Sequence, residues 1–345
     1  MLDQCRLPVV LAPLAGGPST PKLCAAVSDA GGLGFLAAGY LSASELATRI
    51  DRTRALTSRP FGVNLFVPGT SAESSQVAAY APGLAREAER AGVQLGEPRW
   101  DDDDWAAKLD LLATSPVEVV SVTFGCPSPE DVARLKRSTG EVWVTVTTVD
   151  EARQADEAGA DCLVVQGSEA GGHRGGGTDD HDGLGLLALI QLVRTSSSTP
   201  LIGTGGIMTG AGLAAVLAAG ARAGALGTVF LRCPEAGTSR VHREALARHD
   251  KPTALTRAFT GRLARGIRNR FLDEHTDAAP TAYPQVHHLT APLRTHGRSI
   301  GDADLVNLWA GQAYALTSDL PAKEIVQRVA NDARTALEHA RQVLG

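Results

Sequence analysis

One stretch, DCLVVQGSEAGGHRGGG at 161–177, holds the residues best suited to chemistry. It opens with a short apolar run and then becomes a glycine-rich loop that carries Gln166, Glu169 and His173. A buried strand that ends in such a loop is a common way to build an active site on a parallel sheet. His173 is therefore the predicted acid or base, since imidazole titrates near neutral pH, and His181 is its nearest rival. Glu169 either orients His173 or is solvated.

Two later strands each end in glycine. PLIGTGGI ends at Gly205-Gly206, and ARAGALGTVF ends at Gly227-Thr228. Glycine lets the backbone N–H groups approach a phosphate closely, because no Cβ stands in the way. Each pair alone is also typical of an ordinary strand-to-helix turn. Together, on the last two predicted strands, they indicate a phosphate site.

Two amides lie within or at the end of apolar strands. Asn64 is inside FGVNLF and Gln166 ends the run before the glycine loop. Amides can donate to and accept from a heterocycle, although hydrogen bonding within the core is the alternative for both. Cys126 follows another strand and is a weaker candidate for ligand contact, and Arg174 is expected at the surface.

The elements that position these residues follow a regular strand-then-helix order. Eight such units in one direction predict a TIM (β/α)8 barrel, an α/β fold, and a doubly wound sheet is the alternative. In a barrel the site lies at the carboxyl ends of the strands, where the candidate residues above are found. The predicted strands are 8–13, 33–37, 61–66, 117–124, 141–147, 161–166, 201–205 and 223–228.

The order of the predicted strands and helices divides the chain into three parts. Residues 1–235 are the predicted barrel, with a helical insertion at about 67–116. Residues 236–320 form an added substrate-binding region, helical and irregular, with 276–299 expected to be irregular. An amphipathic helix at 321–345 is expected to pack back on the barrel.

The acidic run Asp101 to Asp104 suits a helix N-terminus, and a solvated helix start is preferred over a metal site. No metal is predicted anywhere in the chain.

Composition limits the possible functions. The 345 residues are 43% hydrophobic and 21% charged, with a net charge of −5, so no nucleic-acid-binding face is expected. Five cysteines without a CxxC pair argue against disulfides and zinc. No apolar run approaches the roughly 20 residues of a membrane helix, and no signal peptide is evident. We therefore expect no membrane association and a cytoplasmic location.

Several stretches together resemble the nitronate monooxygenases, formerly called 2-nitropropane dioxygenases. They are PVVLAPLAGGPSTPKL, FGVNLF, VVQGSEAGGHRGG, LIGTGGIMTGAGLAAVLAAGA with GALGTVFL, and WAGQ, in family order over most of the chain. QGSEAGGHRG is the most specific of them. The AGGPSTPKL turn and WAGQ resemble the class I branch.

The resemblance implies a TIM barrel with an added, mostly helical substrate domain that binds FMN. It implies that His173 is the catalytic base and that small-molecule nitronates or nitroalkanes react with O2, giving a carbonyl compound and nitrite. The protein is expected to be a monomer or homodimer. The implied FMN-binding residues are Ala12, Pro13, Leu14, Ala15, Asn64, Gln166, Gly171, Gly205, Gly206, Leu226, Gly227, Thr228 and Gln312.

Three alternatives remain open from the sequence. Similar flavin barrels include NADH:quinone reductases and enoyl-acyl carrier protein reductases, which share the glycine-histidine loop. Phosphosugar isomerases and lyases use the same phosphate-binding strand ends, but usually need a lysine or carboxylate at a strand end. A non-catalytic flavin or interaction protein is the third, and the intact His173 loop argues against it.

Overall fold

The computed structural model describes residues 1–179 and 183–345. Its main sheet has eight parallel strands in the order β1-β9-β8-β6-β5-β4-β3-β2. A parallel bridge between Val10 and Leu33 joins the two ends of this order, so the sheet closes into a barrel and the predicted fold is confirmed. The strands are β1 Val9–Leu11, β2 Gly34–Ala37, β3 Phe61–Phe66, β4 Val119–Thr123, β5 Glu141–Val146, β6 Cys162–Gln166, β8 Leu201–Thr204 and β9 Ala223–Leu226.

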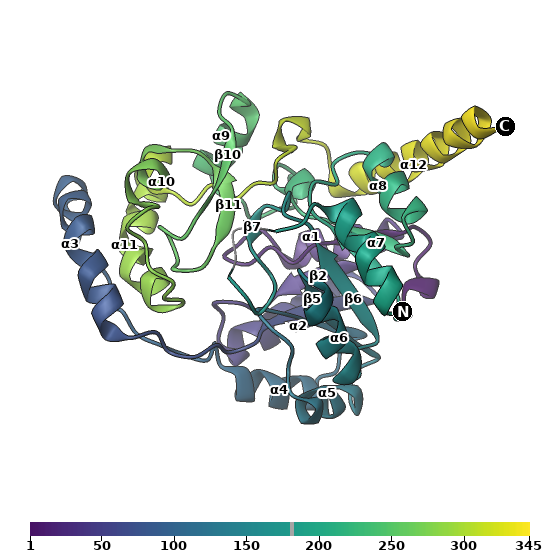
Figure 1. The fold of residues 1–345 in the computed structure, drawn as a ribbon, viewed down its shortest axis with the longest axis horizontal. Helices are drawn as coiled ribbons and strands as arrows, with labels where there is room; N and C mark the ends of the chain where they lie inside the picture. The colour runs from purple at the N-terminus through teal and green to yellow at the C-terminus, as the bar shows by residue number, and fades with distance from the viewer. Residues whose placement is uncertain (180–182) are drawn as a thin grey trace.

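Helices surround this barrel (Figure 1). Hydroxyl side chains fix several of their starts: Thr20 accepts from the Leu23 N–H at 3.0 Å, and Ser42 forms a capping box with Glu45. The last helix, α12, packs against α8 and α1 and so completes the ring. These helices are α1 Pro21–Asp29, α2 Ala43–Leu56, α4 Trp105–Thr114, α5 Pro129–Lys136, α6 Val149–Glu157, α7 Leu186–Ser196, α8 Gly210–Ala218 and α12 Ala322–Leu344, with short 3₁₀ turns at Leu2–Gln4 and Thr228–Phe230.

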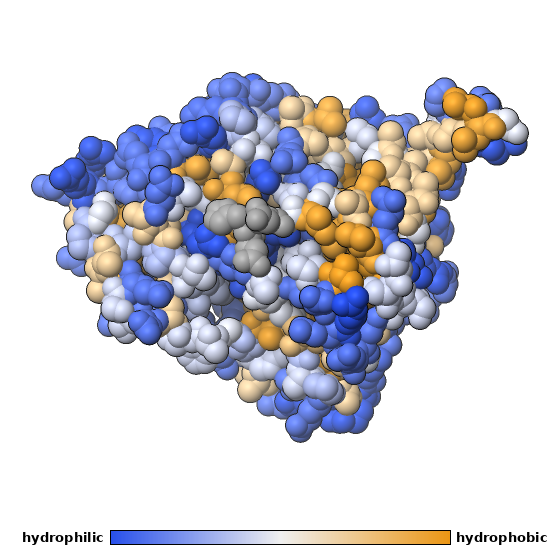
Figure 2. Space-filling model, viewed as in Figure 1, coloured by the Kyte–Doolittle hydropathy of each residue, from blue (hydrophilic) through white to orange (hydrophobic). Residues whose placement is uncertain are grey.

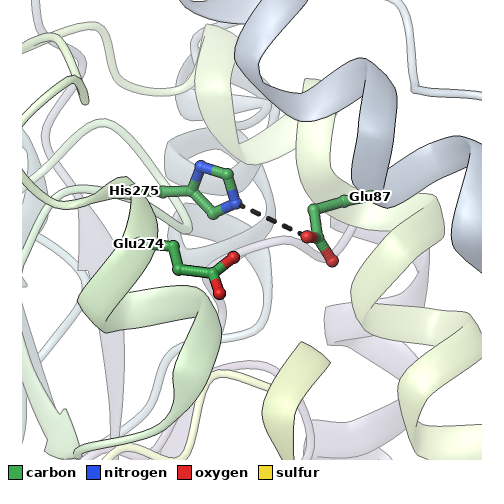
Figure 3. Close-up of side chains that lie close together, drawn as sticks. All are labelled: Glu87, Glu274 and His275. Carbon is green, nitrogen blue, oxygen red and sulfur yellow. Dashed lines mark ion pairs between the residues drawn. The ribbon is translucent and has the colours of Figure 1, made fainter.

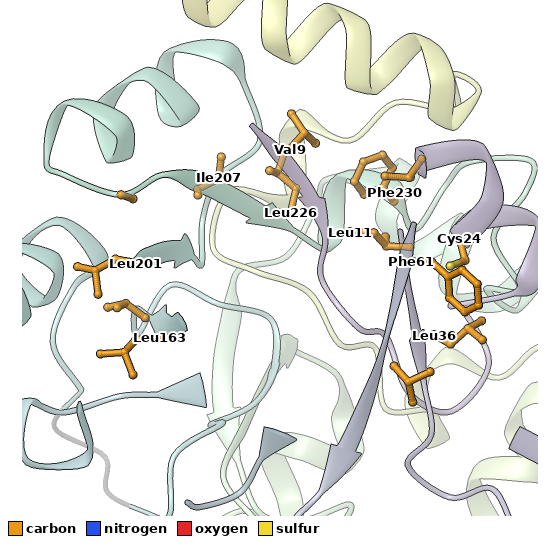
Figure 4. Close-up of a cluster of buried hydrophobic side chains, with 14 of the residues drawn as sticks. Val9, Leu11, Cys24, Leu36, Phe61, Leu163, Leu201, Ile207, Leu226 and Phe230 are labelled. Atoms are coloured by element: carbon orange, nitrogen blue, oxygen red, sulfur yellow. The ribbon is translucent and has the colours of Figure 1, made fainter. Parts of the chain in front are cut away.

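Alternate residues of the strands face two different cores. One set, including Leu11, Leu163 and Leu226, packs between the sheet and the helices (Figure 4). The other set fills the amino-terminal half of the barrel interior, where the rings of Phe35 and Trp143 lie 5.5 Å apart. The barrel is thus sealed at that end, and a cavity can open only at the carboxyl ends of the strands.

A second lobe stands over the carboxyl ends of the strands. It has its own apolar core, which joins α3 Ser74–Ala91 to α10 Arg270–His275 and α11 Gln285–Ile300. A three-stranded antiparallel sheet connects it to the barrel. The remaining elements of this part are β7 Gly172–His173, α9 Arg240–Arg248, β10 Thr253–Thr256 and β11 Ala264–Ile267, with 3₁₀ turns at Ala303–Leu305 and Tyr314–Leu316.

The expectation of an irregular segment at 276–299 holds for 276–284 but was wrong for 285–299, because α11 begins at Gln285. Its composition of proline, histidine and threonine conceals the pattern of a helix. Val286, Leu289 and Leu293 are buried at helical spacing, and packing against α3 overrides the weak local preference.

The acidic run at 101–104 is not simply a solvated helix start. The carboxylate of Asp103 is 15% exposed and lies 2.7 Å from the ammonium of Lys108, which is 1% exposed. Asp103 also accepts a hydrogen bond from the Tyr40 N–H at 2.8 Å. The run therefore contributes a buried ion pair that holds the start of α4 against the barrel.

Glu87, Glu274 and His275 lie close together where α3 meets α10 (Figure 3). The geometry is that of an ion pair, because Arg270 donates to both carboxylate oxygens of Glu87, at 2.7 and 2.8 Å. Arg270 also bonds Glu274 at 2.9 Å. The guanidinium already supplies the positive charge that the carboxylates attract, so the cluster ties the two helices together.

On the face shown in Figure 2, exposed apolar side chains gather over α7 and at the end of α12. Leu187 and Leu192 are exposed on α7, and Val343 and Leu344 are exposed at the projecting end of α12. None of the described helices combines the length and apolar composition needed to span a membrane.

Candidate active site

A cavity of about 420 Å³ lies between the carboxyl ends of the barrel strands and the second lobe. Polar side chains near the carboxyl ends of the barrel strands line this cavity, including Asn64, Thr145 and Gln166. Twelve of the residues predicted for the site line it: Ala12, Pro13, Leu14, Ala15, Asn64, Gln166, Gly171, His173, Gly205, Gly206, Gly227 and Thr228.

Two other predicted residues, Leu226 and Gln312, are not in that lining. The Leu226 side chain is 1% exposed and points into the core between sheet and helices. The Gln312 side chain is exposed, and the backbone N–H of Gln312 donates to the Glu169 carbonyl at 3.0 Å. The neighbouring Gly311 lines the cavity instead and donates its N–H to the Thr228 hydroxyl at 3.0 Å.

At the end of the cavity where a phosphate is predicted to bind, the backbone adopts unusual conformations. Gly205 and Gly206 have φ of +116° and +69°, which favour glycine. A Cβ on Gly206 would lie 3.0 Å from the Glu169 side chain. Within the described residues, the N–H groups of Gly205, Gly206 and Gly227 donate to no other group. Free donors at one end of a cavity fit an anionic phosphate.

Both amides are hydrogen-bonded to the protein as well as facing the cavity. The Asn64 amide nitrogen donates to the hydroxyls of Ser121 and Thr123, each at 2.9 Å. Gln166 donates to the His173 carbonyl at 3.1 Å and accepts from the Gly175 N–H at 2.8 Å. Gln166 therefore holds both sides of the histidine in place. The alternative of hydrogen bonding within the protein holds for both amides, and their contact with a heterocycle stays a prediction.

His173 is on a short strand and not, as expected, in a long free loop. It pairs with Ala264 of β11, so the second lobe fixes the backbone of the site. Its Nε2 lies 2.9 Å from the Thr260 hydroxyl, which in turn lies 3.2 Å from the Arg262 carbonyl. When Thr260 donates to that carbonyl, it accepts from Nε2–H, and the imidazole Nδ1 keeps its lone pair.

The surroundings of His173 keep it neutral. Burial is the largest cause, and the charges of Arg262 and Arg294 add to it, so that the pKa of His173 is lowered to about 3. Its ring lies 5.5 Å from Trp309, 5.6 Å from Phe124 and 6.0 Å from Tyr283 between ring centroids. A neutral imidazole in such an aromatic cage does not attract an anion by charge.

The remaining polar candidates from the sequence, where they are described, lie outside the cavity lining. Glu169 accepts from the Leu186 N–H at 3.0 Å and so caps α7, which neither of its expected roles foresaw. Arg174 is 7% exposed, so the expected surface position was wrong. Cys126 is half-buried, near the Gln154 carbonyl, and is not in the cavity lining. His181 lies outside the described residues.

Sequence reasoning missed several residues of the site, some from the ends of barrel strands and some from the second lobe. Tyr40 stacks on His287, with centroids 4.1 Å apart, and Arg294 follows two turns later on α11. Phe124 has a φ of +80°, rare for a bulky residue, and Arg262 lies over its ring at 4.2 Å. Only the position of Phe124, directly before Gly125 at a strand end, gave a signal in the sequence.

Comparison with known proteins points to the same family as the sequence motifs. The sequence profile of a family described as nitronate monooxygenase matches residues 3–332. A protein of Staphylococcus aureus (strain Newman) named a probable nitronate monooxygenase is 36% identical over 342 residues, which is 96% of each chain.

Two solved structures are also similar. A nitroalkane oxidase from Streptomyces ansochromogenes has a TM-score of 0.95 and 48% identity, covering 98% of this chain and 99% of its own. FabK from Thermotoga maritima has a TM-score of 0.78 and 26% identity, covering 99% and 97%. The profile match extends over nearly the whole chain, through the barrel, the cavity lining and the second lobe, and the chain therefore belongs to the nitronate monooxygenase family.

Proposed function

We propose that the protein uses FMN to oxidise alkyl nitronates, such as propionate 3-nitronate, with O2 to a carbonyl compound and nitrite. Family membership supports an oxidoreductase that acts on nitronates. The observation that carries the finer proposal is a single cavity that joins free N–H donors at two strand ends to a neutral, caged histidine.

The residues of the cavity fit FMN. The free N–H groups at Gly205, Gly206 and Gly227 would hold its phosphate, and the backbone of 12–15 would lie beside its ring system. Asn64 and Gln166 face the same space with amide groups. When bound, FMN supplies electron transfer from the nitronate and onward to O2.

His173 would accept the proton α to the nitro group when the substrate is a neutral nitroalkane. Its lowered pKa keeps the base form populated, but it also makes the imidazole a weak base. A nitronate has already lost that proton. We therefore propose that preformed nitronates are the better substrates, and that a protonated His173 does not hold them.

The second candidate is an FMN-dependent reductase that takes electrons from NADH. The similarity to FabK over nearly the whole chain favours it, at lower identity than the nitroalkane oxidase. The two functions differ in the electron donor, so one experiment separates them.

That experiment mixes the FMN-loaded protein anaerobically with propionate 3-nitronate and, separately, with NADH, and follows the flavin absorbance. Loss of the oxidised flavin spectrum with the nitronate, and slow change with NADH, is the expected result. Fast reduction by NADH and none by the nitronate would contradict the proposal and favour the reductase.

A further inference from the structure

Arg294 on α11 is a buried cation without an acidic partner. Its side chain is in the cavity lining, and the residue is 6% exposed. Its Nε donates to the Thr290 hydroxyl at 3.1 Å and its Nη2 to the His287 carbonyl at 2.7 Å, both uncharged groups. Within the described chain no carboxylate forms an ion pair with it, and burial lowers the pKa of Arg294 to about 10.

The buried cations of the described chain differ in their partners. Lys108 has Asp103 at 2.7 Å, whereas Arg174 and Arg265 form no ion pair with a described residue and lie outside the cavity lining. Placing an unpaired charge in a protein interior costs several kcal/mol, and at Arg294, which lines the cavity, a ligand can supply the missing partner.

The other charged groups of the cavity lining also favour an anionic ligand. Arg294 and Arg298, one turn apart on α11, are the cavity's formally charged lining residues within the described parts of the chain, since no aspartate or glutamate lines it. Arg298 lies toward the surface, where its side chain is exposed. The charge of Arg294 reaches the reactive end, because it lowers the pKa values of His173 and His287. The cavity therefore favours ligands that carry more than one negative charge.

The hydrogen bonds already made by Arg294 narrow the class of ligand. Nε is used, and Nη2 lies near both the His287 carbonyl and, at 3.3 Å, the His287 Nδ1, which leaves the two hydrogens of Nη1 for the cavity. Charged N–H donors of this kind bind the oxygens of an anion such as a carboxylate.

We propose that Arg294 binds a carboxylate on the substrate, so that the preferred substrates are nitronates that carry a carboxylate at their other end. This inference rests on the proposed function and adds to it the specificity-determining residue. The nitronate group would lie toward His173, and the carboxylate would lie toward α11.

The test compares two nitronates of similar length, propionate 3-nitronate with two negative charges and butyl 1-nitronate with one. Values of kcat and KM are measured for the wild type, Arg294→Met, Arg294→Lys and, as a matched control for lost charge, Arg334→Met, whose arginine is exposed on α12 outside the cavity. The flavin content and thermal unfolding of each variant establish that it is folded.

We expect the wild type to prefer the dianion at least tenfold in kcat/KM. In Arg294→Met that preference should fall by about tenfold to several hundredfold, chiefly through KM, because a buried charge pair is lost. Arg294→Lys should recover part of the preference and Arg334→Met should keep all of it. Equal losses for both nitronates would overturn the inference and place Arg294 against the flavin or in the fold.

A wild type with no preference would also overturn the inference, while oxidation of both nitronates would leave the proposed function intact. Oxidation of neither would instead refute the proposed function, so the two failures are distinguishable.

Discussion

The pH dependence of the reaction with a neutral nitroalkane tests the environment of His173 directly. Burial, Arg262 and Arg294 together lower the pKa of His173 to about 3. At pH 5 such a group is about 1% protonated, whereas a histidine with an ordinary pKa of about 6.5 would be about 97% protonated. The structure therefore predicts that acidification to pH 5 leaves the base almost fully active.

The assay measures initial rates of O2 consumption with nitroethane between pH 5 and 8, expressed as kcat/KM for the neutral form of the substrate. We expect His173 to contribute no decline across this range. The His173→Asn variant should lose roughly 10²- to 10⁴-fold at every pH, because asparagine cannot accept the proton.

A decline in the kcat/KM of the wild type with a midpoint between pH 6 and 7, absent from the residual activity of His173→Asn, would refute the reasoning. It would show that His173 is protonated as in water, and hence that the aromatic cage does not desolvate it and the two arginines do not oppose its positive charge.

Three further predictions concern binding and stability. Gly206→Val should weaken FMN binding at least tenfold in equilibrium dialysis, because a side chain would crowd the phosphate and strain a φ of +69°; unchanged affinity would count against that placement. Burial lowers the pKa of His242 to about 4, so the unfolded chain binds the additional proton and stability falls as the pH drops from about 6.5 to 4. His242 alone should contribute roughly 3 kcal/mol to that loss, seen in urea unfolding as the difference between the wild type and His242→Asn, because the buried His173 adds a loss of its own over the same range. Glu87→Gln should cost about 1.5–3 kcal/mol in urea unfolding, because it removes the charge that Arg270 contacts through both carboxylate oxygens, whereas the more exposed Glu274→Gln should cost under about 1 kcal/mol; equal effects would contradict the role given to Glu87.

Local signals in the sequence determined the barrel and the strand ends of the site. Alternation and length mark strands such as 61–66, and the hydroxyl caps at Thr20 and Ser42 mark where helices begin. Because parallel strands place their carboxyl ends on one face, the positions of Asn64 and Gly206 followed from order along the chain alone. These features depend on neighbours within a few residues.

What covers the barrel was decided by the tertiary structure. The hydroxyl that contacts His173 belongs to Thr260, 87 residues away, and α11 forms only where its apolar face meets α3. The same packing places Arg294 in the cavity without an acidic partner. Burial and charge at a site depend on which distant segments exclude water from it, and no local pattern in the sequence records that.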